Sequence, residues 1–365
     1  PTFCFQYTIL ELNTAVKPFF LAHLFEQRGL QRLLYFDPDI YFYAPVTEHF
    51  DSLGSCSILL TPHLTGFLDE KGRPSERDIL RAGVYNLGFL GLSNTGATQE
   101  FLRWWQEKCK RDCVAEPERG LFVDQRWVDL VPGLFEDVLI TRDPGSNVAY
   151  WNLNHRKVDR VEGRWQVEGA PLRFFHFSGF ESEHPERVSK HQDRFTLDDL
   201  PQAKALFTEY AERLMACGYR ETSDWPYAFG RFDDGRRIPD IARRIYRELG
   251  SEVAAFGNPF ETKGANSFAD WLDSTAPEFP AGEPPITRMA FEIYKRRPDV
   301  RQAYPNIGGA DRAAFARWMR LGARTDHGLD EGFLAPYLAA REPLEETTRA
   351  VARQVVSLRT RFARR

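Results

Sequence analysis

Short apolar runs alternate with helical segments through the first half of the chain, and this alternation constrains the fold more than any other feature. The apolar runs predict strands at 33–36, 57–60, 84–92, 138–140 and 172–175. Apolar residues at helical spacing predict helices over 8–28 and 97–113, with Pro18 either dividing the first helix or placing its start at Lys17. Strands that alternate with helices predict an α/β layer structure with a mostly parallel sheet.

The pattern changes after residue 197. Helical periods separated by loops rich in proline and glycine predict helices at 202–216, 238–249, 286–297, 311–321 and 343–363. A chain of 365 residues is long enough for two domains. We therefore expect an α/β domain over 1–197 and a helical accessory module over 198–365.

Composition excludes several classes of protein. The formal net charge of −4 argues against a nucleic-acid-binding protein, which would usually carry a basic surplus. No apolar run approaches the ~20 residues that a membrane-spanning helix needs. Five cysteines are an odd number without a disulfide-framework spacing, which favours reduced thiols. The predicted location is the cytoplasm, either free or peripheral to the inner face of the membrane.

An acidic turn follows the first predicted strand. The segment Tyr35-Phe36-Asp37-Pro38-Asp39-Ile40 delivers two carboxylates at the end of an apolar run. Ligands bind at this edge of open α/β sheets. Paired carboxylates suit Mg²⁺ or Mn²⁺, which can act as a Lewis acid for a departing diphosphate. The alternative is an ordinary surface turn, since Asp and Pro are common turn residues.

Three further motifs follow the acidic turn in a fixed order. They are Asn86-Leu87-Gly88, Asp124-Gln125 and His176-Phe177-Ser178-Gly179. The ordered set resembles the glycosyltransferases of family 8, which include glycogenin and bacterial lipopolysaccharide galactosyltransferases. The resemblance covers roughly residues 10–185. The sequence at 124–127 and 147–152 is similar to that of bacterial polysaccharide-assembly glycosyltransferases.

The resemblance implies a fold, a reaction and partners. It implies a GT-A-like (Rossmann-like) domain and a metal-dependent, retaining type of sugar transfer, with Mn²⁺ or Mg²⁺ as cofactor. The donor would be a nucleotide-diphosphate sugar, such as a UDP- or GDP-sugar, and the acceptor a glycan or a lipid-linked hydroxyl compound. Such a reaction belongs to the assembly of bacterial surface polysaccharides or glycoconjugates.

The resemblance also implies roles for individual residues. Asp37, Asp39 and His176 match the metal ligands of the family. The residues that match its donor-binding positions are Lys17, Asp37, Asn86, Gly88 and Asp124. Asp124 and Gln125 match the positions at the reacting sugar and are the catalytic candidates, while Trp151 and Asn152 are candidates for acceptor contact.

The chain departs from the family pattern in two places. The family follows His-x-x-Gly with a Lys-Pro-Trp whose lysine grips the diphosphate; that lysine is absent here, and Arg187 or Lys190 would substitute for it. Few residues precede Asp37, so either the base-binding strand lies outside this sequence or the base is held in another way. The helical half is similar, around Arg297-Pro298-Asp299-Val300, to a region beside transferase domains in bacterial multidomain polysaccharide enzymes, whose other domains would be partners.

Two other functions remain open at this stage. Phosphohydrolases of the haloacid dehalogenase type also place Asp-x-Asp after an apolar strand, here Asp37 and Asp39, and Asp233-Asp234 could serve as their later acidic pair. A non-catalytic glycan-binding or scaffold protein on a degenerate transferase fold is the second alternative. The absent lysine favours it.

Overall fold

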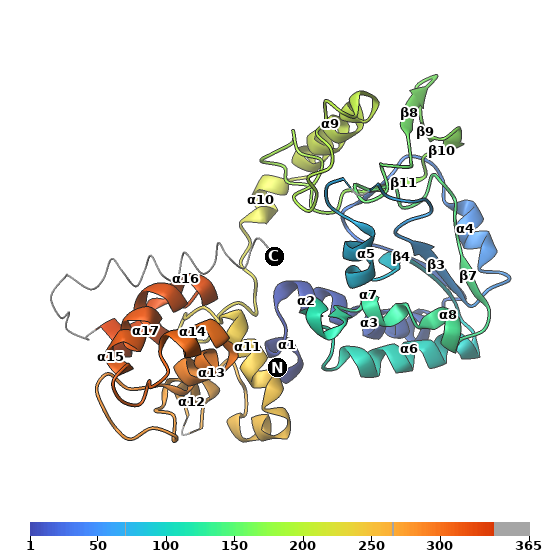
Figure 1. The fold of residues 1–365 in the computed structure, drawn as a ribbon. Coiled ribbons are helices and arrows are strands. Elements are labelled where there is room, and N and C mark those ends of the chain that lie inside the picture. Colours follow the sequence, from blue (N-terminus) through green and yellow to red (C-terminus); the bar gives the residue numbers. More distant parts are fainter. Residues whose placement is uncertain (70, 265, 339–365) are drawn as a thin grey trace. The chain divides into compact units, whose positions relative to one another are not determined.

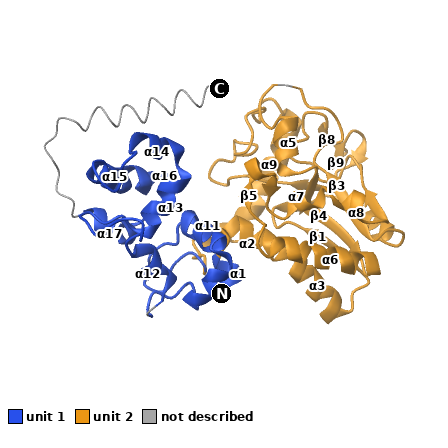
Figure 2. Cartoon of the chain, turned by 60° about the horizontal axis from the view of Figure 1, so that its bottom comes forward, with its two compact units in different colours: residues 1–5, 229–365 blue, residues 6–228 orange. Residues whose placement is uncertain are grey.

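The computed structural model describes residues 1–69, 71–264 and 266–338 (Figure 1). These residues divide into two compact units, which Figure 2 colours separately. The described residues of 6–228 form the first, which we call the sheet unit, and residues 1–5 together with the described residues of 229–338 form the second, which we call the helical unit.

The sheet unit begins with helices and then mixes short strands with helices. Its strands are β1 (Arg32–Phe36), β2 (Ile40–Phe42), β3 (Ile58–Pro62), β4 (Tyr85–Ser93), β5 (Ala115–Glu116), β6 (Leu121–Phe122), β7 (Val138–Ile140), β8 (Val158–Val161), β9 (Arg164–Val167), β10 (Ala170–Pro171) and β11 (Phe174–His176). Its helices are α2 (Ile9–Ala15), α3 (Lys17–Arg28), α4 (Thr47–Ser52), α5 (Glu76–Ala82), α6 (Gly96–Cys109), the 3₁₀ helix η1 (Pro117–Arg119), α7 (Gln125–Val128), α8 (Val131–Leu134), α9 (Pro201–Ala216) and α10 (Tyr219–Ser223).

The central sheet has the strand order β1-β4-β3-β7. The prediction of a mostly parallel sheet is wrong, because β4 pairs antiparallel with both β1 and β3, and only β3 and β7 run parallel. The prediction was wrong because it treated the helices between the strands as crossovers. Parallel strands need a crossover of a dozen or more residues, usually with a full helix. The helices α4 and α5 have only six and seven residues and serve as short connections.

Several predicted elements have the expected positions. The first helix is divided, as Pro18 indicated, into α2 and α3, which begins at Lys17. β4 runs without interruption through Asn86 and Gly88 and is buried along most of its length. Helix α6 buries Phe101 and Trp105 completely, and burial of each such side chain stabilises a fold by about 2 to 3 kcal/mol.

Helix α9 belongs to the sheet unit, so that unit extends beyond the expected boundary at 197. Its buried face, with Leu206, Phe207 and Tyr210, joins a core cluster that contains Phe175 and Phe177. The rings of Phe177 and Tyr210 stack with centroids 3.7 Å apart. The sheet unit therefore ends at Ala228, and α9 belongs to it because this helix packs against β11 and the residue that follows β11.

The helical unit has its own hydrophobic core. Among its described residues, β-structure is limited to two isolated bridges. Its helices are α1 (Thr2–Phe5), α11 (Asp240–Glu248), η2 (Gly250–Phe256), α12 (Phe268–Asp273), α13 (Arg288–Arg296), α14 (Pro298–Ala303), α15 (Arg312–Trp318), the π-helical turn η3 (Met319–Ala323), α16 (Arg324–His327) and α17 (Glu331–Leu338). Phe5 of α1 is fully buried in this core, where it contacts Tyr246 and Phe268.

The predicted helices of the second half are present as α9, α11, α13 and α15, while 343–363 lies outside the described residues. The chain therefore combines a mixed α/β region with a helical C-terminal region. No helix in the described ranges has the length and apolar character needed to span a membrane.

Candidate metal centre

Three strands bring the acidic turn and His176 together. β1 ends at Phe36, the turn carries Asp37 and Asp39, and β2 starts at Ile40. β11 pairs antiparallel with β2 in a register that sets His176 opposite Ile40. Backbone hydrogen bonds hold the turn, since the Asp37 N–H donates to Gly88 O at 2.8 Å and the Phe177 N–H donates to Asp39 O at 2.9 Å. Residues far apart in sequence thus converge on one turn.

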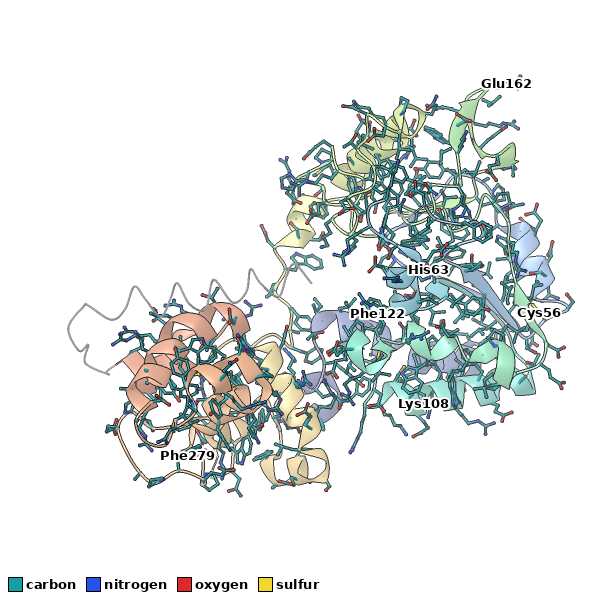
Figure 3. All side chains as sticks on the ribbon, viewed as in Figure 1. Cys56, His63, Lys108, Phe122, Glu162 and Phe279 are labelled. Carbon is teal, nitrogen blue, oxygen red and sulfur yellow. The ribbon has the colours of Figure 1, made fainter. Side chains whose placement is uncertain are left out.

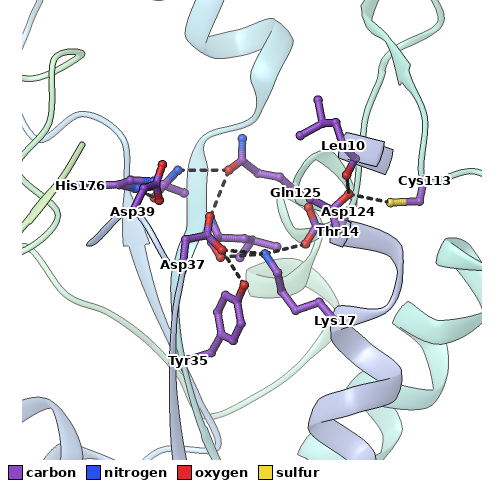
Figure 4. Close-up of polar contacts among 12 residues, drawn as sticks. Leu10, Thr14, Lys17, Tyr35, Asp37, Asp39, Cys113, Asp124, Gln125 and His176 are labelled. Atoms are coloured by element: carbon purple, nitrogen blue, oxygen red, sulfur yellow. Dashed lines mark hydrogen bonds and ion pairs between the residues drawn. The ribbon is translucent and has the colours of Figure 1, made fainter. Parts of the chain in front are cut away.

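Asp37, Asp39 and His176 form a cluster that fits a divalent cation. One ligand atom from each lies within 4.8 Å of the other two, and no other group of three His, Cys, Asp or Glu in the described ranges does so. Nε2 of His176 is 3.0 Å from Oδ1 of Asp39, a buried oxygen for which the described residues provide no further hydrogen-bond partner (Figure 4). Carboxylate oxygens and an imidazole nitrogen are ligands that suit Mn²⁺, so the residues present fit such an ion.

The charge state of Asp39 also suits a ligand. Burial raises the pKa of this carboxyl group, but its hydrogen bond and ion pair with His176 outweigh burial and hold the pKa below its usual value. The carboxylate is therefore ionised at neutral pH, as metal binding requires.

Lys17 supplies the positive charge next to the cluster. Its Nζ lies 3.0 Å from Oδ2 of Asp124 and 3.7 Å from Oδ1 of Asp37, and it donates to Leu87 O at 3.0 Å (Figure 4). Burial on its own lowers the pKa of a lysine, but Asp124 and Asp37 outweigh it, so the pKa of Lys17 lies above its ordinary value. Oδ1 of Asp37 also accepts a hydrogen bond of 2.6 Å from the hydroxyl of Tyr35.

Asn86 and Gln125 connect the cluster to the backbone. Oδ1 of Asn86 is 3.1 Å from Nδ1 of His176, and Nδ2 of Asn86 donates to Oε1 of Gln125 at 3.3 Å. Gln125 in turn accepts from the N–H of Leu87 at 3.1 Å and donates to Ala82 O at 2.8 Å. Both side chains are buried. Gln125 is therefore held by the protein at both ends of its amide.

Gly88 leaves the space that His176 occupies. A Cβ atom at this position would lie 2.3 Å from Cε1 and 2.7 Å from Nδ1 of the His176 ring, a separation that real Cβ atoms essentially never show. The glycine of the Asn86-Leu87-Gly88 motif is explained by this close approach of the imidazole to β4.

Trp151 lies between the imidazole of His176 and a second histidine, His63, and contacts both rings. Trp151 contacts His176 edge-on with ring centroids 5.2 Å apart and contacts His63 in the same way at 5.0 Å. Nε2 of His63 lies 3.3 Å from Nδ2 of Asn86, and burial lowers the pKa of His63 to about 4, so this imidazole is neutral at pH 7. His63, which Figure 3 labels in the sheet unit, directly follows β3; a lone histidine at that place gave no recognisable motif.

The cluster lies in a cleft of about 760 Å³ within the sheet unit, a size typical of small-molecule sites. The cleft is lined by nearly every predicted site residue: Lys17, Asp37, Asp39, Asn86, Gly88, Asp124, Gln125, Trp151 and His176. Asn152 is the exception. It is fully buried, does not line the cleft, and its Nδ2 donates to the backbone oxygens of His63 and Asn147.

The wall formed by 73–82 and 190–193 carries charges of both signs, since Arg73 and Lys190 line the cleft together with Asp78 and Asp193. Lys190 lines the cleft and is exposed, and no carboxylate of the described residues pairs with it. Arg187, the other predicted substitute for the absent lysine, does not line the cleft and instead lies 3.9 Å from Glu186. Arg194 ties the two loops of this wall together by donating to the backbone oxygens of Asp69 and Pro74.

Comparison with known proteins identifies relatives in Bacillus subtilis (strain 168). The chain is 33% identical to the uncharacterized protein YfnF over 199 residues, which is 53% of this chain and 64% of YfnF. It is 32% identical to the uncharacterized protein YfnD over 179 residues, which is 47% of this chain and 55% of YfnD. The chain thus spans less than two thirds of the length of these relatives. No protein-family model matches the chain, and no solved structure is significantly similar to it.

Proposed function

We propose that the sheet unit is a metal-dependent glycosyltransferase domain of the GT-A-like type. It would transfer a sugar from a nucleotide-diphosphate sugar to a hydroxyl group of a glycan or lipid-linked acceptor, with retention of anomeric configuration. The observation that carries the proposal is the convergence of Asp37, Asp39 and His176 in a cleft that also contains Lys17.

The charges in the cleft suit a diphosphate. Asp37, Asp39 and His176 would hold a divalent ion, which would supply positive charge to stabilise a departing nucleoside diphosphate. Lys17 lies beside Asp37 in the cleft wall, and Lys190 brings an ammonium group to the same cleft that pairs with no carboxylate of the described residues. Lys190, rather than Arg187, is our candidate for the cation that contacts the donor phosphates.

The sugar-binding part of the proposal rests on buried polar groups. Asp124 and Gln125 line the cleft. Asp124 is paired with Lys17, and Gln125 is hydrogen-bonded to the backbone, so we assign them to shaping the cleft and not to proton transfer. No carboxylate of the described residues is clearly placed as a nucleophile, so we favour front-face substitution, with the acceptor proton passing to the leaving phosphate. Trp151 lines the cleft although its side chain is largely buried, and it is our candidate for an aromatic contact to a sugar ring.

The rival functions have weaker support. A phosphohydrolase of the haloacid dehalogenase type would use Asp233 and Asp234 as a second acidic pair. Asp233 instead accepts hydrogen bonds from Thr262, and Asp234 pairs with Arg236, all inside the helical unit. A non-catalytic glycan-binding scaffold would not need a set of metal ligands, whereas Asp37, Asp39 and His176 are all present and lie together. Domains of a larger polysaccharide-assembly enzyme remain proposed partners.

Calorimetry separates these possibilities. The full-length protein should bind one of a panel of UDP- and GDP-sugars in the presence of Mn²⁺, and binding should be lost after chelation. It should not hydrolyse p-nitrophenyl phosphate. Hydrolysis of that phosphate would favour the phosphohydrolase, while glycan binding without metal-dependent nucleotide binding would favour the scaffold. NMR of the product anomer tests retention.

A further inference from the structure

We infer that Asn86 and Gln125 fix the position of the proton on His176, so that the Nε2 lone pair of this imidazole is directed toward the metal. The inference rests on the metal site of the proposed function and assigns to Asn86 a positioning role. It departs from the donor-sugar contact that the family resemblance implied for this residue.

The orientation of the Gln125 amide follows from the backbone alone. The atom that faces the N–H of Leu87 must be an acceptor, and the atom that faces Ala82 O must be a donor. Oε1 therefore lies toward Leu87 and Nε2 toward Ala82, and the reverse orientation would oppose donor to donor and acceptor to acceptor. Two backbone groups thus determine which end of the Gln125 amide carries hydrogen.

The orientation of Asn86 follows from that of Gln125. Because Oε1 of Gln125 is an acceptor, the Asn86 atom 3.3 Å from it must be the amide nitrogen. The second N–H of this nitrogen faces Nε2 of His63, also at 3.3 Å. Both donors of Asn86 are therefore engaged inside the protein, and its Oδ1 is the atom left to face His176.

The proton on His176 is fixed in the same way. Oδ1 of Asn86 can only accept, so Nδ1 of His176, 3.1 Å away, must carry hydrogen. With Nδ1 holding its proton, Nε2 is the nitrogen that would exchange its hydrogen bond to Asp39 for a bond to a metal ion, using its lone pair. Partners of this kind, on the far nitrogen of a ligating histidine, set its orientation and raise its basicity.

Burial and close contacts hold the His176 ring in this orientation. Asn86 and His176 are both more than nine-tenths buried, so water does not replace the lost partner readily. Gly88 and Trp151 lie against the ring. These hydrogen bonds form one fixed series, which leaves Nε2 of His176 as the nitrogen available for coordination. The series runs from the backbone of Leu87 and Ala82 through Gln125 and Asn86 to His176.

Two substitutions of Asn86 separate this role from a purely structural one. Asn86→Leu removes the acceptor for His176 and the donors to Gln125, whereas Asn86→Asp keeps an acceptor and loses the same donors. Both should lower the melting temperature. Only Asn86→Leu should weaken binding of Mn²⁺ alone, measured by electron paramagnetic resonance, by about 10- to 100-fold. Wild-type affinity in Asn86→Leu, or equal weakening in both variants, would overturn the inference.

Nitrogen-15 NMR of histidine-labelled, metal-free protein reads the proton directly. The His176 signals, assigned by their loss in His176→Gln, should report a protonated Nδ1 in the wild type. In Asn86→Leu the Nδ1 atom should lose its proton, so that the N–H of the neutral ring lies on Nε2, where Oδ1 of Asp39 accepts it. An unprotonated Nδ1 in the wild type would refute the inference. Failure of the wild type to bind Mn²⁺ would instead refute the proposed function, because the NMR result does not depend on metal.

Discussion

Lys17 and Asp124 form an ion pair of 3.0 Å in which both side chains are almost completely buried. Lys17 begins α3, and Asp124 directly precedes α7, so the pair joins two helices that are distant in sequence. Removing one partner of such a pair leaves a charge without compensation, which typically costs about 3 to 5 kcal/mol. The pair therefore contributes to the stability of the cleft as well as to its charge.

Replacement of Lys17 by methionine should destabilise the sheet unit by about 3 kcal/mol at pH 7. Burial raises the pKa of Asp124 and Lys17 opposes that effect, so the substitution should raise this pKa further. A carboxyl group with a folded pKa above its unfolded value favours folding when protonated. The variant should therefore lose stability as pH rises, in urea unfolding measured from pH 4 to 7. The double variant Lys17→Met/Asp124→Asn should recover much of the loss; no recovery would contradict the account.

Alanine at position 88 should damage the metal site. Its Cβ would lie 2.3 Å from Cε1 of His176, so the imidazole has to move. We expect Gly88→Ala to weaken Mn²⁺ binding at least ~10-fold and to cost about 1 to 3 kcal/mol of stability. Gly96→Ala is the matched control, because no atom lies within 4 Å of a Cβ there. Equal Mn²⁺ affinity in the two variants would show that the close approach does not matter.

His63 should make folding sensitive to pH in the acid range. Burial lowers its folded pKa from 6.5 to about 4, so the unfolded chain binds the proton more readily. Stability due to neutral His63 is complete above pH 6.5 and should fall by up to about 3 kcal/mol as pH decreases to 4. His63→Gln retains an acceptor for Asn86 and a donor for Val84 O, and it should flatten this part of the stability curve. A curve as steep as that of the wild type would be the adverse result.

Lys190 is the residue that we expect to contact the donor phosphates, and Arg187 serves as the matched control. Both are exposed cations on one segment, but only Lys190 lines the cleft. Lys190→Ala should raise KM for the nucleotide sugar about 10-fold, since a charge-assisted contact to phosphate contributes ~1.5 kcal/mol or more. Arg187→Ala should leave KM unchanged. Steady-state kinetics checks both, and a larger effect from Arg187→Ala would reverse the assignment.

The local parts of the fold and site follow from sequence, while the pairing of distant segments does not. Pro18 marked the start of α3 near Lys17, and apolar runs located β1, β3 and β4. The direction of β4 relative to its neighbours was wrong, because strand periodicity carries no information about which way the partner runs. Short connecting helices also leave the same alternating pattern as true crossovers.

The limits at the site have a similar cause. The ordered motifs named Asp37, Asp39 and His176, which the register of β2 and β11 brings together. Asn152, beside Trp151 in sequence, lies instead in the backbone hydrogen-bond network outside the cleft. His63 and the amide path through Asn86 were not predictable, since hydrogen bonds between side chains far apart in sequence leave no periodic signal.

The central claim is that Asp37, Asp39 and His176 hold an ion that permits sugar transfer from a nucleotide donor. The most direct measurement is release of nucleoside diphosphate from UDP- and GDP-sugars by the wild-type protein and by Asp39→Asn, with Mn²⁺ and with chelator. We predict release from at least one donor that requires Mn²⁺ and falls at least ~100-fold in Asp39→Asn, as expected for loss of several kcal/mol of charge stabilisation. Release that is independent of metal, or equal in the two proteins, would contradict the account.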